Sequence, residues 1–361
     1  MSNTTFKLFA DKMGGTSSTN YIGTLGEIFY DQNVGTLKLS DGVTAGGTAI
    51  TVASAPTDYS QTSLFFVDPL RVDSYASTGT VYRPFKTLAT AYAAAVSAGK
   101  NDTNPAFIVL MGNITESITL TQGGIWLIGA YGSGTHGSFN LTGTITINGA
   151  GANSVANHFQ IANLRVIAPN GGHGILFTGT NPQKVFMRDI WIDANTTKTC
   201  VYADNTGTAS TLHFEEAHLT HSGSGDIYCV DVVHGTVTMS DIETSGTVQV
   251  AAVRSGATLT IDGSEIDANN GAALEVYGGT VAITNSMITN AQANSNGIAL
   301  NTAGSVATLG NVVFNIPAGT GKALYAVAGT AAYYANVTFY PSSNQGKSAA
   351  ITPVALANAF T

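Results

Sequence analysis

One pattern of apolar and polar positions recurs along the second half of the chain. Eight six-residue segments share the order apolar, variable, turn residue, small or apolar, variable, usually apolar. They are IANLRV (161–166), MRDIWI (187–192), FEEAHL (214–219), MSDIET (239–244), IDGSEI (261–266), ITNSMI (283–288), LGNVVF (309–314) and YANVTF (334–339). The intervals between their third positions run from 22 to 27 residues and average about 25. Because one such unit cannot bury its apolar face alone, this repeat predicts a solenoid whose stacked coils share a core.

The third position of the pattern mostly holds residue types that form turns. It is occupied by Asn163, Asp189, Glu216, Asp241, Gly263, Asn285, Asn311 and Asn336. Asn, Asp and Gly tolerate a left-handed backbone and cap turns locally, and a stack of identical turns needs that tolerance in every coil. Each strand would pair with its equivalent one coil away, so we predict an all-β solenoid of about ten coils over residues 105–361.

The repeat also predicts which side chains face solvent. If the fourth and sixth positions face the core, the fifth faces outward. The fifth-position column reads Arg165, Trp191, His218, Glu243, Glu265, Met287, Val313 and Thr338. Trp191 and His218, together with Asp267, are candidate glycan-binding residues. Glu243 and Glu265, one coil or about 5 Å apart, have the separation of the carboxylate pair in a retaining glycosidase and are candidate catalytic residues.

Loop lengths predict a groove over this column. The coils carrying Glu243 and Glu265 are the shortest, with brief loops at 245–246 and 268–271, and longer loops flank them at 220–226 and 291–297. We therefore expect a shallow groove floored by Glu243, Glu265 and Asp267, with His218 and Trp191 at one end. Met287 and Val313 continue the column as apolar side chains. Packing between chains and plain solvation are thus alternatives to glycan contact and catalysis.

Two further parts precede the solenoid. The pattern of residues 1–55 predicts a small β-rich module in which short strands alternate with turns. The strands are expected at Phe6–Phe9, Gly26–Tyr30 and Thr36–Ser40, and the turns at Asn33–Gly35 and Asp41–Gly42. Residues 56–104 comprise a linker, an entry strand and one helix.

The helix is predicted over residues 84–99, where it would cap the first coil. Pro84 suits its first turn and Gly99 its end. Its apolar face would comprise Phe85, Leu88, Tyr92, Ala95 and Val96.

Composition narrows the possible functions. Charged residues make up only 10% of the chain, 44% of residues are hydrophobic and Gly contributes 41. This excludes intrinsic disorder and coiled coils. The net charge of −8, with only 14 basic residues, argues against a nucleic-acid surface. The N-terminus lacks the apolar region of a signal peptide and no run of 18 apolar residues occurs, so we expect neither secretion nor membrane insertion.

Histidine and cysteine spacing predicts no metal site and no cofactor. His213, His218 and His221 cluster in sequence, but the turn at Glu216 would direct the first two to different sheets. Cys200 and Cys229 are too few for a disulfide framework. Two buried thiols are the simpler expectation, although the pair could also lie one coil apart within disulfide distance.

Two segments resemble known families. The run FVDPLRVDSYASTGTVYRPFKTLATAYAAA (66–95), followed by FIVLMGNITESITLTQGGIWLIGA (107–130), resembles the opening of a pectate-lyase-like right-handed parallel β-helix, with its Pro-Phe-x-Thr helix cap and Gly-x-x-x-Glu first coil. The run LGEIFYDQNVGTLKLSDGVTAGGTAI (25–50) resembles a module at the start of bacteriophage tail-fibre and other virion proteins. Glu27, Leu37, Asp41, Gly42 and Thr44 carry that match.

Together the resemblances imply a phage virion protein, a tail fibre or short tailspike. Residues 1–55 would attach it to other virion proteins, and a homotrimeric β-helix would project and contact host-surface glycan. One alternative is a tailspike depolymerase that hydrolyses envelope polysaccharide through Glu243 and Glu265. Another is a decoration or baseplate component that contacts only virion proteins. The calcium-binding aspartates and catalytic Arg or Lys of the lyases find no match here, and Arg188 and Arg254 stand apart in the sequence.

Overall fold

A computed structural model describes most of the chain. The described residues are 20–25, 28–31, 36–49, 63–72, 76–130, 139–149, 157–195, 197–207, 209–223, 228–246, 249–292, 294–317 and 320–340. The backbone divides into two compact units, Met1–Gln61 and Thr62–Thr361.

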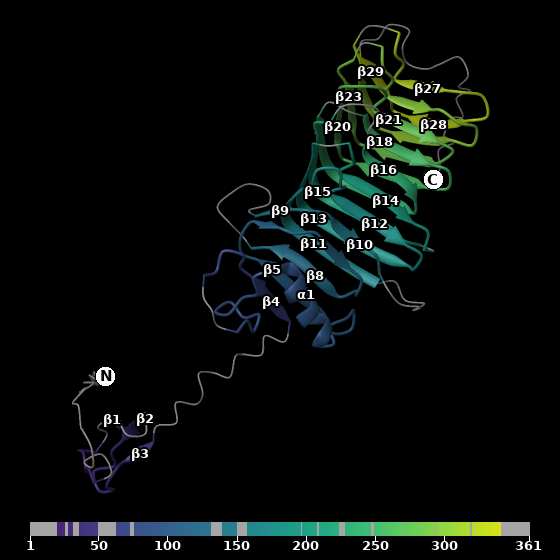
Figure 1. The fold of residues 1–361 in the computed structure, drawn as a ribbon. Helices are drawn as coiled ribbons and strands as arrows, with labels where there is room; N and C mark the ends of the chain where they lie inside the picture. Colours follow the sequence, from purple (N-terminus) through teal and green to yellow (C-terminus); the bar gives the residue numbers. More distant parts are fainter. Residues whose placement is uncertain are drawn as a thin grey trace, which may run out of the picture. The chain divides into compact units, whose positions relative to one another are not determined.

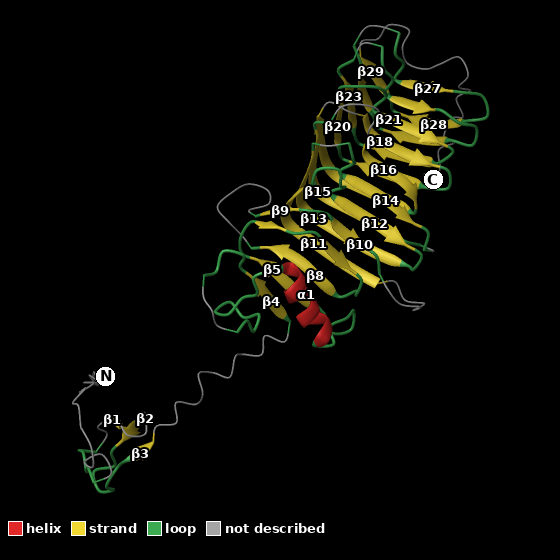
Figure 2. Cartoon of the chain, viewed as in Figure 1, coloured by secondary structure: helices red, strands yellow, loops and turns green. Residues whose placement is uncertain are grey.

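The larger unit is a solenoid of parallel strands, one of whose faces is a single nine-stranded sheet (Figures 1 and 2). Its strands are β7 (Ile118–Leu120), β10 (Ile145–Ile147), β12 (Ile175–Gly179), β14 (Val201–Asn205), β16 (Tyr228–His234), β18 (Gln249–Arg254), β21 (Leu274–Tyr277), β24 (Ile298–Leu300) and β27 (Leu324–Ala326). Stacked one per coil, they span eight full turns from β7 to β27. The expectation of about ten coils covered residues 105–361, of which residues 341–361 lie outside the described part.

The other two faces are formed by strands that bend at the turn position. Four long strands cross the bend: β11 (Asn157–Ile167), β13 (Gln183–Ala194), β15 (Thr211–His221) and β17 (Thr236–Gly246). In later coils the two halves are separate strands: β19 (Thr258–Asp262) and β20 (Glu265–Ala268), β22 (Thr280–Thr284) and β23 (Met287–Asn290), β25 (Val306–Gly310) and β26 (Val313–Asn315), β28 (Ala331–Ala335) and β29 (Thr338–Tyr340). The first coils contribute β4 (Leu64–Val67), β5 (Ala106–Leu110), β6 (Ile114–Thr115), β8 (Ile125–Gly129) and β9 (Asn140–Thr142).

Every turn residue predicted from the repeat adopts a left-handed backbone. The φ angles of all eight lie between 49° and 58°. In the later coils their side chains form a ladder along the stack. Asn336 donates from Nδ2 to Oδ1 of Asn311, and Asn311 donates likewise to Asn285, each at 3.0 Å. The ladder satisfies side-chain amides while the turns bend each coil in the same place.

The core follows the predicted alternation. Leu164 and Val166, at the fourth and sixth positions of the first repeat, are fully buried, and so are Val312 and Phe314 of the seventh. Phe159, Phe177, Phe214 and Phe314 are the largest fully buried side chains. One continuous apolar core therefore runs through the stacked coils.

Helix α1 (Leu88–Ser97) packs against β4, β5 and β8 at the start of the stack (Figure 2). It begins four residues after Pro84, because Thr87 is the N-cap and accepts a hydrogen bond from the Thr90 N–H. Glu116 of the first coil also caps this end, accepting from the N–H groups of Leu88 and Ala89 at 2.8 and 2.9 Å. The buried face comprises Leu88, Ala91 and Ala95, whereas Val96 is exposed, contrary to the predicted stripe.

The smaller unit contains a three-stranded antiparallel sheet of β1 (Ile28–Asp31), β2 (Thr36–Leu39) and β3 (Thr48–Ala49). The strand expected at Phe6–Phe9 and the turn at Asn33–Gly35 lie outside the described residues. The turn at Asp41 and Gly42 is present. Asp41 accepts from the Thr44 N–H at 2.6 Å and from the Thr44 hydroxyl, and these bonds lower the pKa of the Asp41 carboxyl to about 2. Gly42 has a φ of 79°.

Three of the five residues in the virion-module match therefore build this turn. The Thr44 hydroxyl donates a hydrogen bond to the Asp41 carboxylate, and Gly42 supplies the left-handed backbone between them. Leu37 lies in β2, and Glu27 lies outside the described residues. The turn explains why Asp, Gly and Thr occur at this spacing.

Candidate functional site

The outward column predicted from the repeat exists in register. Parallel pairing joins Arg165 to Trp191, Trp191 to His218, His218 to Glu243 and Glu243 to Glu265. It continues through Met287 and Val313 to Thr338. Each neighbour lies one coil away because equivalent positions of parallel strands stack directly.

An open hollow of about 880 Å³ lies over the middle of this column. Trp191, His218, Glu243, Glu265 and Met287 line one side of it. The other side is formed by the turn residues Glu216, Asp241, Gly263 and Asn285. The turn column therefore bounds one side of the hollow, whereas the predicted walls at 220–226 and 291–297 lie partly outside the described residues. We call it the glutamate groove.

Asp267 does not line the glutamate groove. It lies two residues beyond Glu265 on β20, in the row that pairs with Thr289. Burial, and secondarily the charge of Glu243, raises the pKa of the Asp267 carboxyl, and a hydrogen bond from Thr289 opposes this shift. Its backbone N–H donates to the Thr244 hydroxyl at 2.9 Å.

Trp191 is held by its neighbours on both sides. The Arg165 guanidinium lies 4.8 Å from the centre of its ring, and the His218 ring lies 4.4 Å away at an angle of 48°. Its indole N–H donates to Asp193 Oδ1 at 2.7 Å, and Arg165 forms an ion pair with the same carboxylate. Since neighbours occupy both sides of the ring, a sugar would meet the edge of Trp191 rather than an open ring face.

The two candidate catalytic carboxylates lie in the open part of the glutamate groove. Glu243 Oε2 is 3.3 Å from His218 Nδ1, and the Glu243 side chain is 63% exposed. Glu265, its neighbour in register, is also exposed. His218 Nε2 lies 3.2 Å from the Ser245 hydroxyl, so both ring nitrogens of His218 have polar neighbours. Carboxylates and an imidazole arranged in this way can hydrogen-bond sugar hydroxyls, and water reaches the exposed Glu243 and Glu265.

The nine-stranded sheet carries a second polar cluster that the sequence did not reveal. Arg254 donates to both oxygens of Asp231, from Nε at 3.0 Å and from Nη2 at 3.2 Å, which raises the pKa of the guanidinium. Its guanidinium lies over the rings of Tyr228 and Tyr277. Both tyrosine hydroxyls donate to Glu275, and burial together with this carboxylate raises the pKa of each. Arg254 thus has several partners on the neighbouring coils.

These partners come from three coils, so local spacing could not bring them together. The available signal was the alignment of two strand-like runs, β18 (Gln249–Arg254) and β21 (Leu274–Tyr277), which places Arg254 opposite Tyr277. A hollow of about 210 Å³ opens beside Arg254 and Asp231 and is lined on its far side by His173 and Lys198. Burial, followed by the charge of Lys198, lowers the pKa of His173. The arrangement can hold an acidic group near Lys198.

The histidines lie as the turn at Glu216 predicted. His213 and His218 occupy opposite sides of that turn and pair in different sheet faces. His221 is fully buried, its Nε2 lies 2.8 Å from the Lys198 carbonyl, and burial lowers its pKa. Within the described ranges, no three His, Cys, Asp or Glu side chains are grouped to hold a metal ion.

The two cysteines do not form a disulfide. Cys200 and Cys229 are free and buried on adjacent coils, and burial raises the pKa of the Cys200 thiol. Among helices in the described part of the chain, none has the length and apolar character needed to cross a bilayer.

A family model described as "Right handed beta helix region" matches residues 173–340. The fold of the larger unit is a right-handed parallel β-helix. No curated protein sequence matches the chain significantly.

Two solved structures are similar to the chain. Pectin methylesterase PemA from Erwinia chrysanthemi is 12% identical, with a TM-score of 0.42 over 79% of this chain and 93% of the other. The A-module of mannuronan C-5 epimerase AlgE6 from Azotobacter vinelandii is 12% identical, with a TM-score of 0.40 over 73% of this chain and 93% of the other.

Proposed function

We propose that this chain is a glycan-binding protein of a bacteriophage virion, a tail fibre or short spike whose β-helix contacts host-surface polysaccharide. The observation that carries the glycan assignment is the glutamate groove, with Trp191, His218, Glu243 and Glu265 in register along about four coils. The virion assignment is supported by the resemblance of residues 25–50 to virion modules.

The chemistry of the glutamate groove suits a sugar chain lying along the stack. Coils repeat every ~4.8 Å, so equivalent side chains offer the same hydrogen-bonding groups again at each step of a polymer. Glu243 and Glu265 accept from sugar hydroxyls, His218 donates or accepts, and the edge of Trp191 supplies apolar contact. Carboxylates on both sides of the groove disfavour an acidic sugar, so a neutral or amino sugar fits it best.

The remaining parts of the chain have proposed roles in the assembly. Residues 1–55 would attach to other virion proteins, and the β-helix would form a homotrimer. Met287 and Val313 continue the column beyond Glu265 as half-buried apolar side chains. Contact between chains at this end of the column would cover them. The mature protein would then reside in the virion after synthesis in the host cytoplasm.

Hydrolysis is a second candidate function, favoured by one observation. Glu243 and Glu265 are direct partners in register, which places two carboxyl groups one coil apart. That is the separation required when one carboxyl protonates the leaving oxygen and the other attacks the sugar. The open, solvated setting of both groups favours binding over cleavage.

The test is to incubate the purified chain with a panel of bacterial capsular and O-antigen polysaccharides and to identify retained and shortened species by mass spectrometry. Binding without cleavage predicts retention that falls about tenfold or more in Glu243→Gln and Glu265→Gln, the loss expected for a hydrogen bond to a charged group. The matched control is Glu215→Gln, a half-buried glutamate on β15 that is not among the lining residues of the groove.

Each alternative gives a different result in the same experiment. Shortened species that vanish in the two Gln variants would establish a depolymerase. Neither retention nor cleavage of any glycan would contradict both assignments and favour a decoration or baseplate protein that contacts only virion components.

A further inference from the structure

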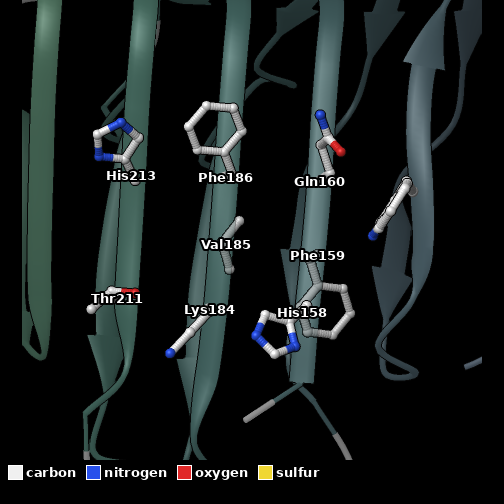
Figure 3. A pocket seen from close by; sticks show the side chains of 9 residues that line it. His158, Phe159, Gln160, Lys184, Val185, Phe186, Thr211 and His213 are labelled. Atoms are coloured by element: carbon white, nitrogen blue, oxygen red, sulfur yellow. The ribbon is translucent and has the colours of Figure 1, made fainter. Parts of the chain in front are cut away.

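A second hollow, of about 370 Å³, lies on the outward face of the strands that precede the turn. Its residues are distinct from those of the glutamate groove. Its floor crosses four neighbouring strands, β8, β11, β13 and β15 (Figure 3). The pairing of Leu127 with Ile161 places Trp126 beside Gln160. Gln160 pairs in turn with Phe186, and Phe186 with His213.

Trp126, Gln160, Phe186 and His213 form one row across the four strands. The two large aromatic residues of this row, Trp126 and Phe186, leave a gap between them. Trp126 and Phe186 are separated by the one strand that carries Gln160, so their backbones are about 9.6 Å apart, two strand spacings. Phe186 stacks on the His213 ring on its far side, at 5.1 Å and 8°. Trp126 meets Phe107 on its own far side, at 4.8 Å and 72°. Both rings are therefore supported from outside the gap, and their inner sides flank Gln160.

The charge of this hollow is opposite to that of the glutamate groove. Its lining includes Lys184, His158 and His213, and none of its described lining residues carries a carboxylate, in a chain of net charge −8. His158 lies 3.8 Å from Asp102, the nearest acidic partner. Lys184 is exposed, and no hydrogen bond or ion pair of its ammonium is seen within the described residues. Figure 3 shows Lys184 beside His158, in the row next to Gln160 and Phe186.

We propose that this hollow is a second carbohydrate site, which takes an acidic sugar unit. The sugar ring would lie between Trp126 and Phe186, where flat apolar walls match the C–H faces of a pyranose. Gln160 would hydrogen-bond its hydroxyls, since an amide both donates and accepts. Lys184 would pair with its carboxylate or phosphate. This assignment does not depend on the function of the glutamate groove.

The chain offers a direct reporter for the test because it contains only two tryptophans, Trp126 and Trp191. In the Trp191→Phe variant, fluorescence reports on Trp126 alone. We expect a saturable change on titration with hexagalacturonate, weakened by rising salt and reduced about tenfold or more in apparent affinity by Phe186→Ala or Lys184→Gln. Glucose 6-phosphate, measured alongside, distinguishes a phosphate from a carboxylate as the preferred acidic group.

Two controls separate this site from the glutamate groove. Thr260→Ala alters the same row three strands beyond Phe186 and should leave the titration unchanged. Glu243→Gln in the same background should also leave it unchanged. The proposal is overturned by an unchanged Trp126 signal at millimolar hexagalacturonate, by an equal response to neutral cellohexaose, or by a response that survives Phe186→Ala. Calorimetry on the unmodified chain checks that Trp191→Phe has not altered the site.

Discussion

Left-handed backbone recurs at the third position of each of the eight repeats, and residue type matters strongly there. Seven of these eight residues are Asn, Asp or Gly, which made the position recognisable in the sequence. Glu216 is the exception, and it adopts a φ of 52° while its carboxylate accepts from Arg188 at 3.2 Å. The surroundings of Trp191 were not predictable, because Arg165, Asp193 and His218 meet it through contacts between coils.

Asn311 allows the backbone and ladder contributions at this position to be separated. Asn311→Gly keeps the left-handed backbone and loses only the ladder bonds, whereas Asn311→Ala loses the bonds and also strains the backbone by about 1–2 kcal/mol. We expect the midpoint of thermal unfolding to fall more for Ala than for Gly. Equal midpoints for the two variants would contradict a conformational requirement at this turn.

Asp267 predicts a pH-dependent change in stability. Because its pKa is raised in the folded state, the stabilising contribution of Asp267 is fully present below its unfolded pKa near 3.8 and is lost as pH rises through the folded pKa. Asp267→Asn should therefore raise the unfolding midpoint slightly at pH 7 and leave it nearly unchanged at pH 3. Thermal unfolding at both pH values checks this, and a lower midpoint at pH 7 would show that the ionised carboxylate is stabilising.

At the scale of elements, strand order and pairing follow from the repeat, whereas the ends of elements depend on contacts between distant residues. The helix was expected from Pro84, but it begins at Leu88, where Thr87 and Glu116 supply hydrogen-bond acceptors. Glu116 is 28 residues away from Leu88. Glu116 caps α1 because the first coil packs against the helix. Residue spacing within the helix cannot reveal such a contact between distant residues.

Removal of the Glu116 carboxylate tests this capping. Glu116→Ala leaves two N–H groups of the first helical turn without their acceptor and should cost about 1–2 kcal/mol. Glu116→Gln retains one acceptor oxygen and should cost less. Urea denaturation measures the free energy of unfolding of both variants. A cost for Ala no greater than for Gln would contradict the capping role.

At the scale of the whole molecule, the solenoid was predictable because one repeat sets the backbone, the core and the outward column together. The polar cluster around Arg254 was not, since it gathers residues from several coils on a face without a repeated motif. The side of the glutamate groove that is formed by the turn residues was also not predicted from the sequence.

The proposed trimer gives a prediction for the intact chain. Burial of Met287 and Val313 between chains would favour a species near three times 37.0 kDa. Light scattering at micromolar concentration measures this mass directly, and Met287→Lys should shift the distribution toward monomer. A monomeric wild-type chain would contradict a self-assembled shaft.

The central claim is that the glutamate groove binds glycan, and Trp191 fluorescence tests it most directly. In the Trp126→Phe variant, Trp191 is the sole tryptophan and lies within 4.4 Å of the His218 ring that lines the groove. We predict a saturable change in its emission with at least one neutral or amino-sugar polysaccharide of the panel, weakened about tenfold or more by Glu243→Gln. An unchanged Trp191 signal with every glycan, or a change indifferent to Glu243→Gln and Glu265→Gln, would contradict the claim.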